Sequence, residues 1–161
     1  MPEPVRVLLV DDEEDFAEAV GFWLTSRGHR VSKARDGEQA LAMLKTDHFD
    51  VMFLDVMMPK LDGIETLRRL RSFNKALPVI LVTASNLTDE NRYAGAKALG
   101  ISGLFPKGSS LNQLNAALEV ALRTLKRPAA AGSAPAAGAA KPGLLDSLRK
   151  AFGSLFPIKR G

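Results

Sequence analysis

The stretch FDVMFLDVMMPKLDGIETL, residues 49–67, places an acid directly after an apolar run. The run, Val51–Leu54, has the length and composition of a buried β-strand, and Asp55 follows it. Further along, Ile64 and Leu67 lie at helical spacing. The stretch therefore predicts a strand, a polar loop and a helix, which is the repeating unit of a parallel α/β sheet.

The same pattern occurs three more times in the chain. The run VRVLLV precedes Asp11 and Asp12, VILV precedes Thr83, and ISGLFP precedes Lys107. Each interval between these polar positions is long enough to hold a crossover helix. The strands are predicted at Val5–Val10, Arg30–Ala34, Val51–Leu54, Val79–Val82 and Ile101–Phe105.

We predict a doubly wound α/β domain with a five-stranded parallel sheet, five helices and a flexible tail. The expected strand order is 2-1-3-4-5, as in flavodoxin-like folds, because it brings the first, third, fourth and fifth strands together. Their carboxyl ends carry the polar residues, whereas the second strand carries none and belongs at an edge. The helices are predicted at 14–27, from about 40 to 47, around 64–71, at 88–99 and at 111–125, the last capped by Ser109 or Ser110.

Composition and charge limit the classes of function. The chain has 161 residues and no cysteine, so disulfides and thiolate metal sites are excluded. Neither a signal peptide nor a stretch of about 18 apolar residues occurs, and we expect a cytoplasmic protein. Five of the 22 Lys and Arg residues, but only one of the 18 Asp and Glu residues, follow Arg127. The main domain is therefore neutral, and we expect no nucleic-acid partner.

The converging side chains suggest phosphoryl chemistry with a divalent cation. Several carboxylates in one crevice repel each other, and oxygen-only ligands favour Mg²⁺ or Mn²⁺. Asp12 and Asp55 are the expected direct ligands, with Asp11 close by. Lys107 and Thr83 would contact the peripheral oxygens of a phosphoryl group. Asp55, at the end of the central strand, is the candidate nucleophile.

Four segments in order resemble the receiver domain of two-component response regulators. They are VRVLLVDDEED, FDVMFLDVMMPKLDGIETL, LPVILVTAS and ISGLFPKGSS, and the resemblance covers about residues 4–126. It implies that Asp55 accepts a phosphoryl group from a histidine kinase or phosphotransfer protein. Lys107 would pair with the phosphoryl oxygens, and Thr83 would move toward them, shifting the surface formed by the fourth helix, fifth strand and fifth helix.

The resemblance also implies a set of metal ligands. Asp12 and Asp55 would bind Mg²⁺ directly, the backbone carbonyl of Met57 would be the third protein ligand, and Asp11 would hold the metal through water. On this interpretation the protein is a phosphoacceptor that assists its own phosphorylation and dephosphorylation, and is not otherwise an enzyme.

Two positions depart from the family pattern. Many members carry an aromatic residue three positions before the lysine, where this chain has Leu104, with Phe105 next to it. Relay by an aromatic rotamer change is therefore not expected in its usual form. Many members also have proline after the lysine, whereas here Pro106 precedes Lys107 and Gly108 follows it.

Three other functions fit the fold less well. A haloacid-dehalogenase-type phosphatase needs a second acid two positions after its nucleophile, where this chain has Met57. A flavin- or nucleotide-binding module needs a Gly-, Ser- or Thr-rich loop after the first strand, but that loop is acidic here. A receiver that acts only as an interaction module, without phosphorylation, remains an alternative although every acceptor position is filled.

The sequence changes character after the receiver region, residues 1–127. Residues 128–143 are rich in Ala, Pro and Gly, which predicts a disordered linker. Residues 144–156 predict a short amphipathic helix, and 157–161 form a basic end. The apolar stripe predicted for docking consists of Leu144, Leu145, Leu148, Phe152, Leu155 and Phe156.

The output is expected to be protein–protein interaction. The tail helix could dock on a protein partner, on an anionic membrane surface or on the receiver itself. The 34 residues after Arg127 are too few for a linker and a DNA-binding domain, so we expect a stand-alone, chemotaxis-regulator-like response regulator.

Overall fold

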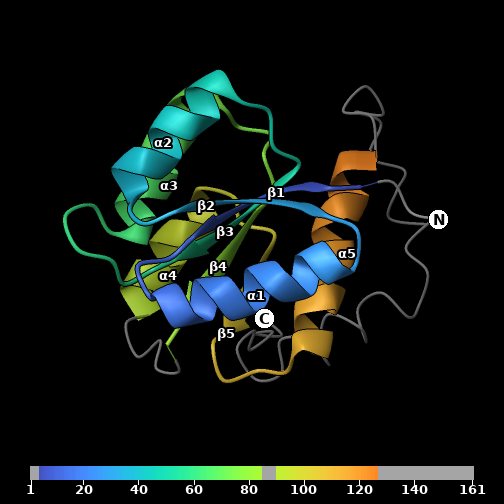
Figure 1. Cartoon of the computed structure of the whole chain (residues 1–161). Helices are drawn as coiled ribbons and strands as arrows, with labels where there is room; N and C mark the ends of the chain where they lie inside the picture. Colours follow the sequence, from blue (N-terminus) through green and yellow to red (C-terminus); the bar gives the residue numbers. More distant parts are fainter. Residues whose placement is uncertain (1–3, 85–89, 127–161) are drawn as a thin grey trace, which may run out of the picture.

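The computed structural model of the chain describes residues 4–84 and 90–126 (Figure 1). The strands are β1 (Arg6–Val10), β2 (Arg30–Ala34), β3 (Val51–Asp55), β4 (Val79–Thr83) and β5 (Gly103–Pro106). The helices are α1 (Glu14–Ser26), α2 (Gly37–Thr46), α3 (Gly63–Phe73), α4 (Glu90–Ala98) and α5 (Leu111–Lys126). The predictions for residues 128–161, and for a helix start at Thr88, lie outside the described residues.

The strands form one parallel sheet in the order β2-β1-β3-β4-β5, which confirms the predicted topology. In the register, Val7 of β1 lies opposite Val31 of β2 and Val51 of β3. Helices α1 and α5 cover one face of the sheet, and α2, α3 and α4 cover the other (Figure 1). This winding leaves a crevice at the carboxyl ends of β1 and β3, where the chain switches direction across the sheet.

The core lies on both faces of the three central strands. All five residues of β3 and of β4 are buried, whereas in β2 only Ala34 is buried and the other four residues are exposed or half-buried. Burial of both faces explains why the central strands are almost continuously apolar. Strand β2 lies at the edge as predicted, and Arg30 and Lys33 are exposed there. Charged side chains of this kind oppose pairing with a further strand.

Side-chain caps fix the starts of three helices. Asp36 accepts a hydrogen bond from the backbone N–H of Gln39 at 2.8 Å, at the start of α2. Asp62 does the same for Glu65 at the start of α3, also at 2.8 Å. At α5 the cap is Ser110, one of the two predicted serines: its Oγ accepts from the Gln113 N–H, while the Gln113 side chain accepts from the Ser110 N–H. This reciprocal pair is a capping box.

The ends of the central strands differ slightly from the predicted ones. Strand β3 includes Asp55 and β4 includes Thr83, so both residues belong to the sheet rather than to the loops that follow. Asp55 lies opposite Val82 in the ladder, and the Val56 N–H donates to the Val82 carbonyl at 3.0 Å. The backbone of the proposed phosphoacceptor is therefore fixed by sheet hydrogen bonds.

Arg71, at the end of α3, has a structural role that the sequence did not reveal. Its guanidinium donates to four backbone carbonyls, those of Leu99 (2.9 Å), Asn74 (3.0 Å), Leu77 (2.8 Å) and Gly100 (2.7 Å). Burial lowers the pKa of this group below its ordinary value. The contacts join the end of α3, the loop before β4 and the turn after α4.

Gly63→Ala is expected to destabilise the domain by more than about 2 kcal/mol, because overpacking at this position cannot be relieved by side-chain movement. A Cβ atom on Gly63 would lie 2.2 Å from the backbone oxygen of Asp55 and 2.8 Å from Cα of Val56. Urea denaturation followed by circular dichroism measures the loss.

Gly95→Ala provides the matched control for this prediction. Gly95 lies within α4, where an added Cβ meets no atom within 4 Å. Alanine favours a helix over glycine by up to about 1 kcal/mol, so this variant is expected to be slightly more stable than wild type. Equal denaturation midpoints for the Gly63→Ala variant and wild type would contradict the close packing at the end of β3.

Candidate functional site

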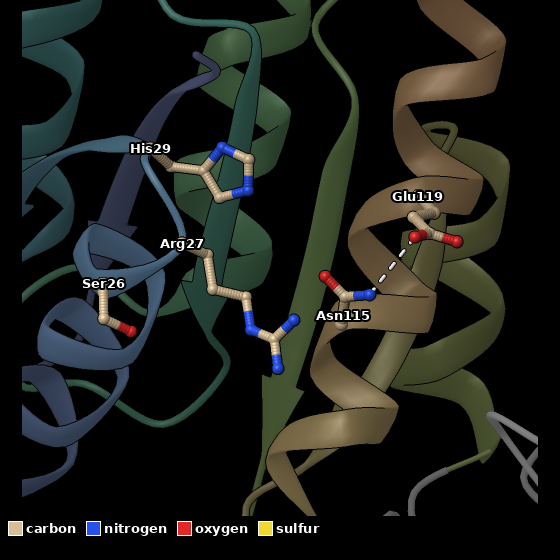
Figure 2. A pocket seen from close by; sticks show the side chains of 5 residues that line it. All are labelled: Ser26, Arg27, His29, Asn115 and Glu119. Atoms are coloured by element: carbon tan, nitrogen blue, oxygen red, sulfur yellow. Dashed lines mark hydrogen bonds between the residues drawn. The ribbon is translucent and has the colours of Figure 1, made fainter. Parts of the chain in front are cut away.

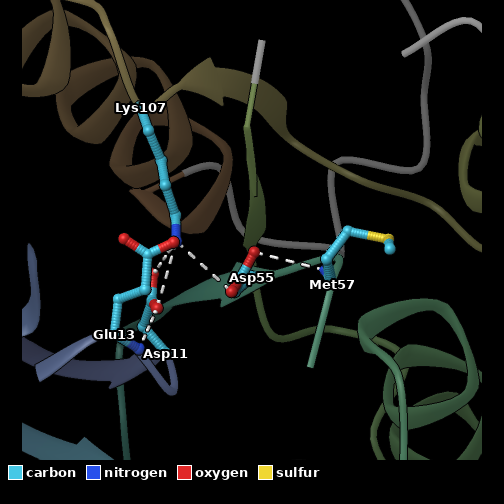
Figure 3. Close-up of polar contacts among 5 residues, drawn as sticks. All are labelled: Asp11, Glu13, Asp55, Met57 and Lys107. Atoms are coloured by element: carbon cyan, nitrogen blue, oxygen red, sulfur yellow. Dashed lines mark hydrogen bonds and ion pairs between the residues drawn. The ribbon is translucent and has the colours of Figure 1, made fainter. Parts of the chain in front are cut away.

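The predicted site residues meet at the carboxyl edge of the sheet. Asp11 follows β1, Asp55 ends β3, Thr83 ends β4 and Lys107 follows β5. Figure 3 shows the Lys107 side chain reaching from β5 across the crevice toward the acids of the first and third strands. The site is therefore built from four adjacent strands, as the predicted order requires.

The Lys107 ammonium contacts three carboxylates (Figure 3). Its Nζ lies 2.9 Å from Oε1 of Glu13, 3.0 Å from Oδ2 of Asp11 and 3.4 Å from Oδ2 of Asp55. It also lies 4.9 Å from the centre of the Phe16 ring, a distance typical of a cation–π contact. Burial lowers the pKa of Lys107, but its hydrogen bonds to Glu13 and Asp11 and the charge of Asp55 outweigh burial, so the net pKa is raised.

Three aspartates form a compact group of oxygen ligands. One carboxylate oxygen each from Asp11, Asp12 and Asp55 lies within 4.8 Å of the other two. Asp11 and Asp55 are 3% and 1% exposed, whereas Asp12 lies at the solvent side. The backbone N–H of Glu13 donates to Asp11 Oδ1 at 2.8 Å, and that of Met57 donates to Asp55 Oδ1 at 3.3 Å.

The two buried acids carry more negative charge than the site compensates. Burial, followed by the charge of Asp11, raises the pKa of Asp55 to about 7, although Lys107 and the Met57 N–H oppose the shift. Burial also raises the pKa of Asp11, against the Glu13 N–H and Lys107. Lys107 is thus insufficient to offset both carboxylates when both are ionised.

The donor set fits a hard divalent cation. Oδ2 of Asp11 lies within ion-pair distance of Lys107, yet it accepts no hydrogen bond from the described residues, since the ammonium donates to Oδ1 at 3.1 Å. A buried carboxylate oxygen without a donor has unused coordinating capacity. The three-aspartate oxygen set matches the preference of Mg²⁺ or Mn²⁺ for carboxylate ligands.

Thr83 and Met57 are joined to the site through their backbone groups. Thr83 is 4% exposed, and its backbone oxygen accepts a hydrogen bond from the Lys107 N–H at 2.8 Å. Met57 is two residues beyond Asp55, with its side chain 62% exposed and its backbone N–H directed at the Asp55 carboxylate (Figure 3). Leu104 and Phe105 are both buried in β5. The aromatic position of the usual relay is therefore occupied by a buried aliphatic side chain.

Sequence reasoning did not single out Glu13 and Phe16, which both contact Lys107. The signal for Glu13 was its place directly after the acid pair, in the loop from β1 to α1. For Phe16 the helical stripe indicated only a core position. A contact between residues about 90 positions apart depends on how β5 lies relative to α1, which periodicity does not specify.

A surface hollow lies apart from this site, between the end of α1 and α5 (Figure 2). It is lined by Ser26, Arg27, His29, Asn115 and Glu119. The Arg27 guanidinium stacks on the Trp23 ring at 4.4 Å. His29 is half-buried, and its Nδ1 accepts a hydrogen bond from the Val5 N–H at 3.4 Å. Burial, and then the charge of Arg27, lower the pKa of His29.

The sheet order, the buried acids and the lysine that spans them define a receiver-type signalling domain. Comparison with known proteins agrees, since the family model for the response regulator receiver domain matches residues 7–119. The chain belongs to the family of response regulator receiver domains of two-component systems.

Curated relatives include the response regulators MprA from two mycobacterial species. That of Mycolicibacterium vanbaalenii is 39% identical over 133 residues, covering 83% of this chain and 57% of the relative. That of Mycobacterium bovis, strain BCG, is 41% identical over 129 residues, covering 80% and 55%. The chain thus spans just over half the length of these relatives.

Solved structures of receiver domains share the fold. The receiver domain of a Francisella response regulator has a TM-score of 0.66 at 33% identity, covering 74% of this chain and 98% of that one. A response regulator receiver protein from Pseudomonas putida has a TM-score of 0.68 at 26% identity, with the same coverage. Among the described residues, no helix combines the length and apolar character needed to cross a bilayer.

Asp55→Asn is expected to stabilise the metal-free domain at pH 8 by on the order of 1–3 kcal/mol. The folded-state pKa of Asp55, about 7, lies above the ordinary aspartate value of 3.8, so the folded state holds this proton more tightly than the unfolded chain. Stability therefore falls as pH rises between these values, and the full penalty is present above about pH 7. The neutral amide introduced by Asp55→Asn removes this stability penalty.

Urea denaturation at pH 8 and pH 4 measures this effect. The advantage of Asp55→Asn is expected to shrink toward pH 4, where the folded and unfolded wild-type chains both hold the proton. Asp47→Asn, which alters an exposed acid at the end of α2, serves as the control and should change stability little at either pH. A variant at Asp55 that is less stable than wild type at pH 8 would contradict the excess negative charge.

Proposed function

We propose that the protein accepts a phosphoryl group on Asp55, in a Mg²⁺-dependent reaction, from a histidine kinase or a phosphotransfer protein. The observation that carries the proposal is the buried Asp55 carboxylate, fixed by β3 and facing both the Lys107 ammonium and the Asp11–Asp12 pair. Family membership supports the same donor class, since receiver domains work with these kinases.

The transfer forms one bond and breaks another. A carboxylate oxygen of Asp55 attacks phosphorus, and the bond from phosphorus to the donor histidine nitrogen breaks, with its electron pair remaining on nitrogen. The product is a mixed anhydride of aspartate and phosphate. Lys107 would hold a peripheral phosphoryl oxygen as negative charge accumulates there. The site has no need of a general base, because bound Mg²⁺ would hold the attacking carboxylate in its ionised form.

Asp12 and Asp55 would bind the metal directly, with the backbone carbonyl of Met57 as a further ligand and Asp11 acting through water. When bound, Mg²⁺ would supply positive charge that offsets the carboxylates and the transferred group. The same groups would assist hydrolysis of the anhydride, so the protein would be a phosphoacceptor that also limits its own phosphorylated lifetime. It would not act on other substrates.

We propose that the output is a phosphorylation-dependent contact with a protein partner in the cytoplasm. The surface of α4, β5 and α5 is adjacent to Lys107, and Leu111 at the start of α5 is 38% exposed. The tail, residues 144–156, would be a second contact, with a protein partner or with a membrane surface. DNA binding is not part of this proposal, because the excess positive charge lies in the tail and the receiver region is neutral.

Beryllofluoride, which mimics the aspartyl phosphate, tests the proposal on the full chain. In amide NMR spectra with Mg²⁺, addition of beryllofluoride is expected to shift the resonances of Asp55, Thr83 and Lys107. The shifts should extend into β5 and α5 if the switch reaches the proposed output surface. Resonances of residues 144–156 report in the same spectra whether the tail responds.

Omission of Mg²⁺ provides the control, since the mimic should then fail to bind. Spectra that do not change in the presence of both Mg²⁺ and beryllofluoride would overturn the proposal and favour an interaction module that works without phosphorylation.

A further inference from the structure

All three donor positions of the Lys107 ammonium are already engaged. Hydrogen bonds run from Nζ to Asp11 Oδ1 at 3.1 Å, to Glu13 Oε1 at 2.9 Å and to Asp55 Oδ2 at 3.4 Å. The shortest of these goes to Glu13 and the longest to the proposed phosphoacceptor. In Figure 3 the ammonium lies between the Glu13 and Asp55 carboxylates, so these two acids draw it in different directions.

The three carboxylates differ in how easily they can separate from the Lys107 ammonium. The side chain of Asp11 is fully buried and that of Asp55 is 2% exposed, whereas the Glu13 side chain is 61% exposed. Water can solvate a released Glu13 carboxylate, but it cannot reach Asp11 in the same way. The backbone of Glu13 is held separately, through its N–H bond to Asp11 Oδ1 at 2.8 Å. The side chain is thus free to move without disturbing the loop.

We propose that Glu13 is a positioning residue that competes with the phosphoryl group on Asp55 for the Lys107 ammonium. This inference deepens the proposed function and rests on it. In the unmodified protein the Glu13 carboxylate accepts the shortest hydrogen bond from Lys107 and neutralises part of its charge. As the phosphoryl group arrives, the ammonium turns toward the new oxygens and the Glu13 carboxylate moves into solvent.

We expect the competition from Glu13 to weaken binding at the site rather than strengthen it. Any group that needs Lys107, whether phosphoryl or beryllofluoride, must displace the Glu13 carboxylate from it, so Glu13 weakens binding and slows transfer. A half-exposed ion pair contributes about 0.2–1 kcal/mol, which corresponds to an effect of up to about fivefold. Removing the contact should therefore strengthen the response of the site, unlike substitution of Asp55 or Lys107.

Glu13→Gln, in the full chain with saturating Mg²⁺, tests the inference. The apparent dissociation constant for beryllofluoride, measured by NMR, is expected to fall about two- to fivefold. The rate of phosphoryl uptake from acetyl phosphate should rise by a similar factor. In that reaction the bond from Asp55 oxygen to phosphorus forms while the phosphorus–oxygen bond of the donor breaks, and acetate leaves with the electron pair.

Two further variants separate a specific contact from a general charge effect. Glu13→Asp keeps the charge but shortens the side chain by one methylene, so it should lose the contact with Lys107 and change binding in the same direction as Glu13→Gln. Glu14→Gln removes an equal charge one position along, from a residue that faces Arg35 at 3.5 Å. It is expected to leave beryllofluoride binding within about a factor of 1.5 of wild type.

Each outcome decides the inference. If Glu13→Gln binds beryllofluoride no better than wild type, or if Glu13→Asp matches wild type while both glutamine variants improve equally, the specific competition is wrong. A separate Mg²⁺ titration must show similar metal affinity in Glu13→Gln and wild type, since a gain explained by tighter Mg²⁺ binding would also overturn it. A wild-type protein that binds no beryllofluoride defeats the proposed function instead.

Discussion

Asp55→Asn protein incubated with acetyl phosphate and Mg²⁺ is expected to take up no phosphoryl group, whereas wild type should gain one. The amide lacks the anionic oxygen that attacks phosphorus, and Asp55 is the last residue of β3, whereas Asp11 and Asp12 lie in the loop after β1. Intact-mass spectrometry at neutral pH counts the phosphoryl groups directly. We expect at least a hundredfold loss in uptake, on the order of other nucleophile substitutions.

The control for this experiment is Asp47→Asn, an exposed acid outside the crevice, which should be phosphorylated as wild type is. Because metal-free Asp55→Asn is expected to be more stable than the metal-free wild type at pH 8, unfolding would not account for the loss. Uptake by Asp55→Asn at the wild-type rate would mean that another residue is the acceptor.

Lys107→Met is expected to have two large effects. Without the ammonium, Asp11 and Asp55 are buried with no cation, so the metal-free domain should lose about 3–5 kcal/mol of stability at pH 8. The loss should be smaller at pH 5, because Asp55, whose pKa is about 7 even with Lys107 present, then binds a proton. Phosphoryl uptake should slow by about 10²–10³-fold, the usual effect of removing one donor to a developing oxyanion.

Mg²⁺ separates these two effects. Saturating Mg²⁺ is expected to restore much of the stability at pH 8, since the metal supplies the missing positive charge, but to leave phosphoryl uptake slow. Lys75→Met, at an exposed position after α3, is the matched control and should be neutral in both measurements. A Lys107→Met protein as stable as wild type at pH 8 without Mg²⁺ would show that the lysine does not compensate the buried acids.

The fold followed from the sequence because the strong signals are local. Apolar runs such as Val79–Val82 predict buried strands, and a polar residue at the end of each run indicates which edge of the sheet carries the chemistry. The position of β2 at the edge also followed, since this strand contributes no polar residue to the site. The exact limits of the strands could not be predicted, because inclusion of Asp55 in β3 depends on a ladder partner in β4.

Part of the candidate site could also be predicted from the sequence, because it depends on the strand order. Strand order alone brings Asp11, Asp55 and Lys107 to one crevice, and the structure places them in contact. The Glu13 contact was missed because it depends on the direction of one long side chain in a loop. The pKa shift of Asp55 was also beyond the sequence, since it arises from burial and from the distance to Asp11.

The hydrogen bonds of Arg71 restrict how α4 could move in response to a change at the site. Its four hydrogen bonds attach Leu99 and Gly100, at the far end of α4, to the end of α3 and to the loop before β4. A displacement transmitted from Thr83 along the chain would therefore reach a point just beyond α4 where these hydrogen bonds fix the backbone. Sliding of α4 along its own axis would break these bonds, whereas rotation about its C-terminal end would leave them in place.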